Sequence, residues 1–237
     1  MKHNEFGQPI GDPVPGWTPR PRPPRTPMVG RYCRVEPLDI SRHAAELHAA
    51  NADAADHRRW TYLNADGFDS ADAYRQWLAQ MSAANDTLFH AIVDSLSNHA
   101  VGVAAYLRID PVNGAIEVGH INYSSRLQQT RAATEAMFLM MRRAFDELGY
   151  RRYEWKCDSL NEPSRRAAAR LGFQFEGIFR QAVVYKDRNR DTAWFSILDG
   201  EWPAIRRAFE LWLAPDNFDA AGHQHHPLAE LIASARA

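Results

Sequence analysis

The stretch Arg126–Leu148 reads R-L-Q-Q-T-R-A-A-T-E-A-M-F-L-M-M-R-R-A-F-D-E-L, and the rest of the chain is organised around it. In its second half, apolar residues recur close to the 3.6-residue period of an amphipathic helix, at Ala136, Leu139, Met140, Ala144 and Leu148, with Phe138 and Phe145 beside them. Its first half is polar, with small side chains at Thr130, Ala132, Ala133 and Thr134. A strand-like run, Ala115–Tyr123, comes just before.

A strand, a polar turn and a helix N-terminus together form a place where an anion can bind. The first four N–H groups of a helix have no partner within the helix, and the helix dipole is positive at that end. Small side chains would let a phosphate approach the backbone. Many helices begin with threonine and alanine and bind nothing, so the context has to decide between a phosphate site and an ordinary packed helix.

Composition narrows the class of protein. The chain has 237 residues, of which 45% are hydrophobic and 24% charged, which is typical of one large or two small globular domains. The formal net charge of −1 gives no bulk attraction to nucleic acid. Two cysteines, Cys33 and Cys157, form no disulfide framework and fit a reducing compartment. Without an apolar membrane span or signal core, we expect a cytoplasmic protein with no membrane or nucleic-acid partner.

The chain divides into three parts. Residues 1–30 are rich in proline, which fixes φ and removes donors, so we expect an extended, irregular arm anchored by Phe6 and Trp17. Residues 31–213 carry the helix and strand signals of one folded domain. Residues 214–237 are expected to form a polar, loose tail, in which residues 228–235 could add one more helix.

Apolar periodicity, capping residues and turns predict the elements of the middle part. Strands are expected at 31–37, 88–93, 100–109, 115–123, 150–158, 173–185 and 192–198. Helices are expected from Asp39 or Ser41 through Ala50, and at 70–84, 126–148, 163–171 and 201–213, with Ser70 and Asn161 as N-caps and a turn at Asn85–Asp86. The three strands joined by short turns should be antiparallel neighbours, and the strand after the central helix should pair in parallel.

This order, together with four motifs, resembles the GNAT superfamily of acetyl-CoA-dependent N-acetyltransferases. The motifs are E-V-G-H-I-N-Y at 117–123, A-T-E-A at 133–136, N-E-P-S at 161–164 and L-G-F-Q-F-E-G at 171–177. They are most similar to the branch of Rim-type ribosomal-protein alanine acetyltransferases, over about residues 30–200. The resemblance implies an α+β fold with a mostly antiparallel sheet of six to seven strands, flanked by helices. One parallel pairing is implied at a splayed cofactor site.

The resemblance also implies a site for acetyl-CoA. The family's pyrophosphate loop, Q/R-x-x-G-x-G/A, falls on residues 128–133, with Arg131 where glycine is usual. That arginine must point away from the phosphates or reach one itself. The implied cofactor loop comprises Gln128, Gln129, Thr130, Arg131, Ala132, Ala133 and Thr134. Backbone groups of Ile121, Asn122 and Tyr123 are implied to bind the pantetheine arm, as a strand added to a sheet edge.

Asn161 and Ser164 match the N-x-x-S of this branch, in which the asparagine contacts the cofactor arm and the serine lies near the thiol. Both residues could equally be structural, as a helix cap and a first-turn residue. Many relatives carry a general-acid tyrosine at the position that is Ala168 here, so Ser164 or a water is the replacement candidate. Arg165 and Arg166 could meet the adenosine phosphate or lie on a solvated helix face.

Acetyl transfer to an amine needs a base for the amine proton and a backbone N–H to polarise the thioester carbonyl. Glu117 is the first candidate for the base, although it could be an outward strand residue. His120 is the second, since the pKa of an unperturbed histidine suits this role. Glu154 and Asp158 could bind a cationic substrate. A set of aromatic residues could shape the acceptor pocket: Trp60, Tyr62, Phe68, Tyr185 and Trp194. The segment with Trp60, Tyr62, Leu63 and Phe68 could instead be a packed lid, which is favoured because large aromatic side chains usually lie in the core.

No metal site is expected, because neither H-Q-H-H at 223–226 nor His48 and His57 has zinc-ligand spacing. We therefore expect an acyltransferase that moves an acetyl group from acetyl-CoA to a primary amine of a small molecule or a protein N-terminus. The alternatives are a non-catalytic acyl-CoA-binding or regulatory protein of the same fold, and an unrelated protein with only a phosphate site. The last helix, with Trp202, Phe209 and Trp212, could cover the core or join a second copy in a homodimer.

Overall fold

The computed structural model describes residues 2–52, 58–84 and 86–236, and this part of the chain contains an eight-stranded sheet. The order is β3-β4-β5-β6-β7-β8-β10-β9, and only β7 and β8 among these neighbours run parallel. The strands are β3 (Met28–Val29), β4 (Cys33–Pro37), β5 (Leu88–Asp94), β6 (Ala100–Asp110), β7 (Ala115–Tyr123), β8 (Arg152–Asp158), β9 (Gln174–Tyr185) and β10 (Arg188–Leu198). The expected α+β class and its single parallel pairing are confirmed, with one strand more than the six or seven expected.

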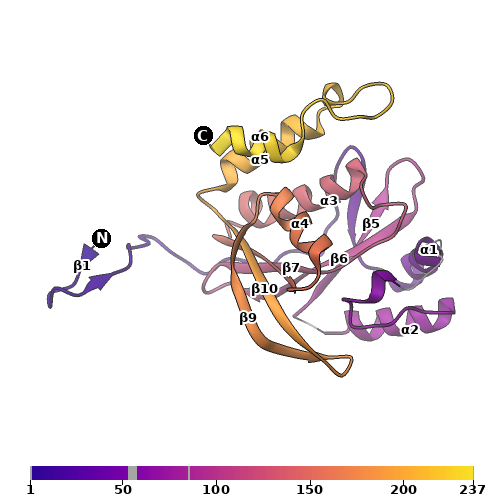
Figure 1. Ribbon diagram of the computed structural model, residues 1–237, viewed down its shortest axis with the longest axis horizontal. Helices are drawn as coiled ribbons and strands as arrows, with labels where there is room; N and C mark the ends of the chain where they lie inside the picture. The colour runs from indigo at the N-terminus through magenta and orange to yellow at the C-terminus, as the bar shows by residue number, and fades with distance from the viewer. Residues whose placement is uncertain (1, 53–57, 85, 237) are drawn as a thin grey trace.

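Helices cover both faces of the sheet (Figure 1). The described helices are α1 (Ile40–Ala52), α2 (Ala71–Ser82), α3 (Arg131–Arg142), α4 (Glu162–Arg170), α5 (Trp202–Leu213) and α6 (Leu228–Arg236), with short turns η1 (Arg58–Trp60), η2 (Arg143–Glu147) and η3 (Pro215–Asn217). One apolar cluster lies between the sheet and α1 and α2, and a larger one between the sheet and α3, α4 and α5. None of these helices is long and apolar enough to span a membrane.

Short polar side chains begin the helices that matter for the site. The hydroxyl of Thr130 accepts from the N–H of Ala133 at the start of α3, and the side chain of Asn161 accepts from the N–H of Ser164 at the start of α4. Ser70 caps α2 as expected. These caps replace hydrogen bonds that a helix cannot make in its first turn, so they define where each helix begins.

The two parallel strands separate part of the way along. The ladder between β7 and β8 runs from Ala115↔Arg152 to Val118↔Trp155, and beyond it β7 stays with β6 while β8 stays with β10. At the point of separation His120 has φ +49°, and the register between β6 and β7 shifts between Val103 and Ala105. A bulge of this kind bends a strand and interrupts its pairing. The sheet therefore opens between the ends of β7 and β8.

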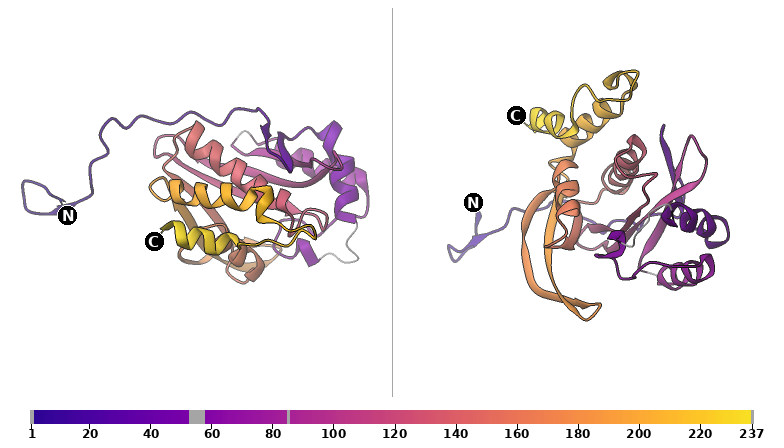
Figure 2. Two further views of the ribbon diagram at one scale, coloured as in Figure 1. Left: turned by 90° about the horizontal axis from the view of Figure 1, so that it is seen from above. Right: turned by 45° about the vertical axis from the view of Figure 1, so that its right-hand side comes forward.

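The N-terminal arm is more ordered than expected. Its end, β3, pairs with β4, and its beginning forms a two-stranded hairpin of β1 (Lys2–His3) and β2 (Pro9–Ile10) that projects from the body (Figures 1 and 2). Trp17 anchors the arm, because its indole N–H donates to the carbonyl of Val112 and its ring lies against Gly114. Phe6 does not anchor it, since this side chain is 78% exposed.

The further helix that residues 228–235 could form is present as α6, but the expectation that the tail is loose is wrong. Helix α6 packs on α5 and buries Leu228 and Ile232, while Asn217 donates to the carbonyls of Trp212 and His226 and holds the intervening loop. Trp202, Phe209 and Trp212 are buried within their own chain, so α5 covers the core rather than offering these rings to a second copy. The expectations for His57 and for a turn at Asn85 lie outside the described residues.

Candidate active site

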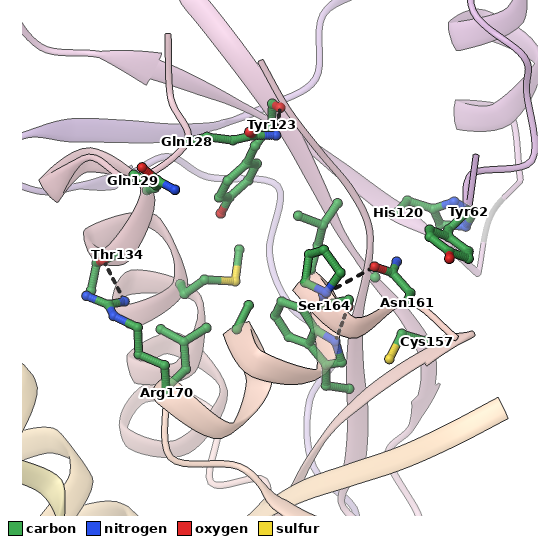
Figure 3. A pocket seen from close by; sticks show the side chains of 18 of the residues that line it. Tyr62, His120, Tyr123, Gln128, Gln129, Thr134, Cys157, Asn161, Ser164 and Arg170 are labelled. Carbon is green, nitrogen blue, oxygen red and sulfur yellow. Dashed lines mark hydrogen bonds between the residues drawn. The ribbon is translucent and has the colours of Figure 1, made fainter. Parts of the chain in front are cut away.

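A cavity of about 890 Å³ opens where β7 and β8 separate. Its walls come from both strands, from the N-termini of α3 and α4, and from the C-terminal segment. Figure 3 shows its two ends: Gln128, Gln129, Thr134 and Arg170 lie at one, and Tyr62, His120 and Asn161 at the other. We call these the loop end and the acceptor end.

The loop end is formed by the turn that leads into α3. The hydroxyl of Thr130 donates to the carbonyl of Leu127 at 2.7 Å, and the side-chain amide of Gln128 donates to the carbonyl of Tyr123 at 2.9 Å. Gln129 has φ +62°, an uncommon backbone conformation for a residue with a side chain. These contacts fix a tight turn whose next backbone groups are the N–H groups of the first turn of α3. Such a helix start binds anions.

The side chain of Arg131 does not extend over the loop that precedes α3. Its guanidinium lies 3.8 Å from the ring centroid of Phe218 and 5.6 Å from that of Tyr32, and therefore points toward the C-terminal segment. The side chain in place of the usual glycine is thus accommodated between Phe218 of the C-terminal segment and Tyr32. Arg170 supplies a second cation at this end, and it donates to the hydroxyl of Thr134 at 3.2 Å.

The residues predicted for cofactor binding are mostly brought together. Those that line the cavity are Ile121, Tyr123, Gln128, Gln129, Thr130, Arg131, Ala133, Thr134, Asn161 and Ser164. Ala132 is buried in the core under α3, and Asn122 faces the other side of the sheet, where it lines a second, small cavity beside α2. Because side chains alternate along a strand, only the backbone of Asn122 can serve the main cavity.

Asn161, Ser164 and Cys157 meet near the acceptor end. The hydroxyl oxygen of Ser164 accepts from the indole N–H of Trp155 at 3.0 Å, which leaves its own proton to donate. Burial raises the pKa of the Cys157 thiol, so this group is protonated at neutral pH and is a weak nucleophile. Cys157 is therefore a wall residue rather than a reactive one.

Glu117 lies under the acceptor end and is 3% exposed. Its carboxylate contacts Nη1 of Arg108 at 2.6 Å and Nζ of Lys156 at 2.8 Å, and Lys156 also contacts Glu154 at 2.8 Å. The negative charge of Glu117 is therefore already matched by two cations. Asp158 is committed as well, because it accepts from the hydroxyl of Tyr185 and from the N–H of Leu160.

His120 lies at the bulge of β7 and lines the same end of the cavity. Its ring centroid is 5.1 Å from that of Phe89. Burial, and secondarily the charge of Arg108, lowers the pKa of His120 below its ordinary value. The imidazole is therefore neutral at pH 7 and able to accept a proton.

The structure decides between the alternatives for several candidate wall residues. Of the five aromatic residues, only Tyr62 lines the cavity; Trp60 and Phe68 pack on each other in the core under α2, and Trp194 stacks on Phe179. Arg165 and Arg166 both pair with Glu162 on α4. Sequence reasoning missed Arg108, Lys156, Arg170, Arg190, Trp212, Phe218 and Gln224, all of which line the cavity. Among residues 2–52, 58–84 and 86–236, no three His, Cys, Asp or Glu side chains gather as metal ligands would.

Comparison with known proteins gives a consistent result. A family model described as an acetyltransferase (GNAT) domain matches residues 34–174. A crystal structure of a GCN5-related N-acetyltransferase from Brucella melitensis is 50% identical, with a TM-score of 0.90 over 93% of this chain and 100% of that one. A Chromobacterium violaceum structure described as one of the "probable acetyltransferases (GNAT family)" is 45% identical, with a TM-score of 0.77 over 82% and 97%. The Bacillus subtilis protein named "Putative ribosomal N-acetyltransferase YdaF" is 27% identical over 71% of this chain and 90% of its own length.

Proposed function

The chain belongs to the GNAT family of acetyltransferases, and from this premise we propose that it moves an acetyl group from acetyl-CoA to a primary amine by direct attack. The observation that carries the proposal is the separation of β7 and β8 beyond Val118 and Trp155, with the start of α3 at one end of the resulting cavity. Acetyl-CoA supplies the acetyl group as a thioester. The amine nitrogen bonds to the carbonyl carbon, the C–S bond breaks, and the amine loses one proton while the thiol gains one.

The cavity fits acetyl-CoA at both ends. The pyrophosphate suits the loop end, where the N–H groups of the first turn of α3 face a space bordered by Ala133, with Arg131 and Arg170 nearby. The pantetheine arm suits the gap between the strands, where backbone groups of Ile121 and Tyr123 have no β8 ladder to bind. Strand β7 borders the gap and ends at Tyr123, just before the loop that leads into α3. The pantetheine arm and the pyrophosphate would therefore bind to consecutive parts of the chain.

The candidate acid–base groups lie at the acceptor end. We infer that His120 is the better supported base, because it is uncharged at pH 7 whereas the charge of Glu117 is engaged by Arg108 and Lys156. Glu117, the first candidate from the sequence, remains the alternative base. Ser164 has a hydroxyl proton to give to the departing sulfur, and we propose it for that role. A backbone N–H of β7 near the bulge would polarise the thioester carbonyl.

The acceptor is proposed to be a protein N-terminus or a small amine. The name of the Bacillus subtilis relative favours a protein acceptor, and Tyr62, Leu63 and Asn64 are among the residues that line the cavity.

Calorimetric titration with acetyl-CoA, followed by thiol-release assays over an amine and peptide panel, tests the proposal. We expect micromolar binding and release with at least one acceptor. Binding without release on any acceptor would favour the non-catalytic alternative. No binding of acetyl-CoA would remove the assignment of the cavity.

A further inference from the structure

Arg108 sits on β6 in a strained conformation at the acceptor end. Its φ is +45°, in the left-handed region that residues with side chains rarely adopt, and the register between β6 and β7 shifts between Leu107 and Asp110. A shift of this kind re-aims a side chain out of its regular alternation. The Arg108 side chain lines the cavity and is 58% exposed, although the carboxylate that it contacts is 3% exposed.

The ion pairs behind Arg108 form one alternating row across the sheet. Arg108 contacts Glu117, Glu117 contacts Lys156, Lys156 contacts Glu154, and Glu154 contacts Arg152. The row ends at Glu176 on β9, which contacts Arg152 and is 38% exposed. Its six charges sum to zero, but Arg108, Glu117 and Lys156, which line the cavity, sum to +1, and Glu154, Arg152 and Glu176, which do not, sum to −1. The row therefore presents positive charge to the cavity.

The other charged groups at this end do not reverse that sign. Asp158 is 5% exposed and its two oxygens already accept from Leu160 and Tyr185. Arg190 lines the same cavity and adds a further cation to Arg108 and Lys156. The carboxylates of Glu117 and Asp158, which line the cavity, already have partners, whereas Arg108 is more than half exposed there. The earlier expectation that Glu154 and Asp158 could hold a cationic substrate is thus not supported by their contacts.

We propose that Arg108 binds an anionic group of the acceptor, so that the enzyme selects amines that carry a carboxylate or a phosphate close to the amine. A guanidinium offers paired N–H groups that match either oxyanion, and in the described part of the chain its paired carboxylate is Glu117, which lies beneath it. This inference rests on the proposed acetyl transfer and assigns a specificity residue to it. On a protein acceptor, the anion would be an acidic side chain next to the N-terminus.

Matched acceptor pairs test the selection. The pairs are β-alanine against β-alaninamide, O-phosphoethanolamine against ethanolamine, and peptides beginning Ser-Asp against Ser-Asn. We expect the anionic member of at least one pair to have a kcat/KM at least tenfold higher, mainly through KM. The first two pairs separate a carboxylate from a phosphate, and the third tests a peptide. Equal kcat/KM values within all three pairs would overturn the inference.

Variants assign the effect to Arg108. We expect Arg108→Gln to abolish the preference and Arg108→Lys to keep part of it, with affinity for acetyl-CoA unchanged in both. Arg42→Gln is the matched control. The Arg42 side chain is 56% exposed and lies 2.7 Å from the carboxylate of Glu36, which is 10% exposed. Arg42 is not among the residues that line the cavity. A preference that survives in Arg108→Gln would contradict the proposal.

A binding measurement separates the two levels of inference. If no acceptor releases thiol, acetyl transfer to these amines fails, and the same pairs are titrated calorimetrically into the CoA-bound protein. Tighter binding of the anionic member, lost in Arg108→Gln, would still support the role of Arg108. Equal binding within each pair would overturn it.

Discussion

The carboxylate of Glu117 lies 2.8 Å from Nζ of Lys156, and both side chains are more than nine-tenths buried. Two buried charges of opposite sign stabilise a fold only when each keeps its partner, because an unpaired buried charge is costly. The pair joins β7 to β8 close to the point where the two strands separate. It therefore closes the sheet directly beneath the acceptor end of the cavity.

The first prediction concerns this pair. Glu117→Gln should lower the free energy of unfolding by about 2 kcal/mol, less than the usual cost of breaking a buried pair because Lys156 keeps Glu154. Denaturant unfolding of Glu117→Gln, Lys156→Met and the double variant measures the coupling. We expect the double variant to lose less than the sum of the two single losses. Strict additivity would mean that the two side chains do not stabilise each other.

The second prediction concerns the base. Because burial lowers the pKa of His120, kcat/KM should fall on the acid side only below the ordinary histidine pKa of about 6.5. His120→Gln should reduce kcat about 100-fold or more and remove this acid limb, since a positioned base contributes about that factor. The pH–rate profile of Glu117→Gln is the comparison. If the limb persists in His120→Gln and disappears in Glu117→Gln, the carboxylate is the base.

The sequence was sufficient for most of the architecture because the relevant signals are local. The apolar period of α3 and the caps Ser70 and Asn161 depend on residues a few positions apart, and the structure bears them out. Trp17 as an anchor of the arm and a helix near the C-terminus were both expected, but the order of the arm and tail was underestimated because it comes from distant partners: β3 pairs with β4, and Phe218 contacts Arg131. Composition alone makes such segments look loose.

The charged residues of the site were harder to predict for a related reason. Arg108 faces the cavity only because the register shifts beside it, and strict alternation along β6 does not reveal this. Lys156 becomes a partner of Glu117 only when β7 and β8 are placed side by side. The sequence motif identifies the strand that carries Glu117. The cations that pair with Glu117, Arg108 and Lys156, lie on the neighbouring strands β6 and β8.

The third prediction concerns the loop end. Ala133→Asp, combined with Gln128→Ala, should weaken the binding of acetyl-CoA at least tenfold, because a carboxylate would face the pyrophosphate and the Gln128 bond to Tyr123 would be lost. Ala73→Asp is the matched control. The N–H of Ala73 donates to the capping hydroxyl of Ser70, as the N–H of Ala133 donates to that of Thr130. Ala73, however, is exposed on α2, away from the cavity. Calorimetry gives both affinities. Wild-type affinity in the Ala133→Asp double variant would show that the loop does not hold the phosphates.

The last prediction concerns the stability of the fold at low pH. His90 on β5 is 2% exposed, and burial, together with the charges of Arg143 and Arg25, lowers its pKa to about 4. In the unfolded chain the pKa is about 6.5, so between these values the unfolded state binds a proton that the folded state does not. The free energy of unfolding should therefore fall as the pH drops from about 6.5 to about 4, by about 3 kcal/mol from this residue. Above pH 6.5 the contribution should be constant.

His90→Gln should flatten this part of the pH–stability curve, whatever its effect on stability at pH 7, because glutamine does not titrate. His225→Gln, at an exposed position near the C-terminus, controls for the loss of a histidine in general. Denaturant midpoints measured at half-unit steps from pH 4 to pH 8 give the slopes. His43 is also buried, and burial lowers its pKa as well, so part of the slope should remain in His90→Gln. Parallel curves for His90→Gln and the parent would show that the folded state binds this proton as readily as the unfolded chain.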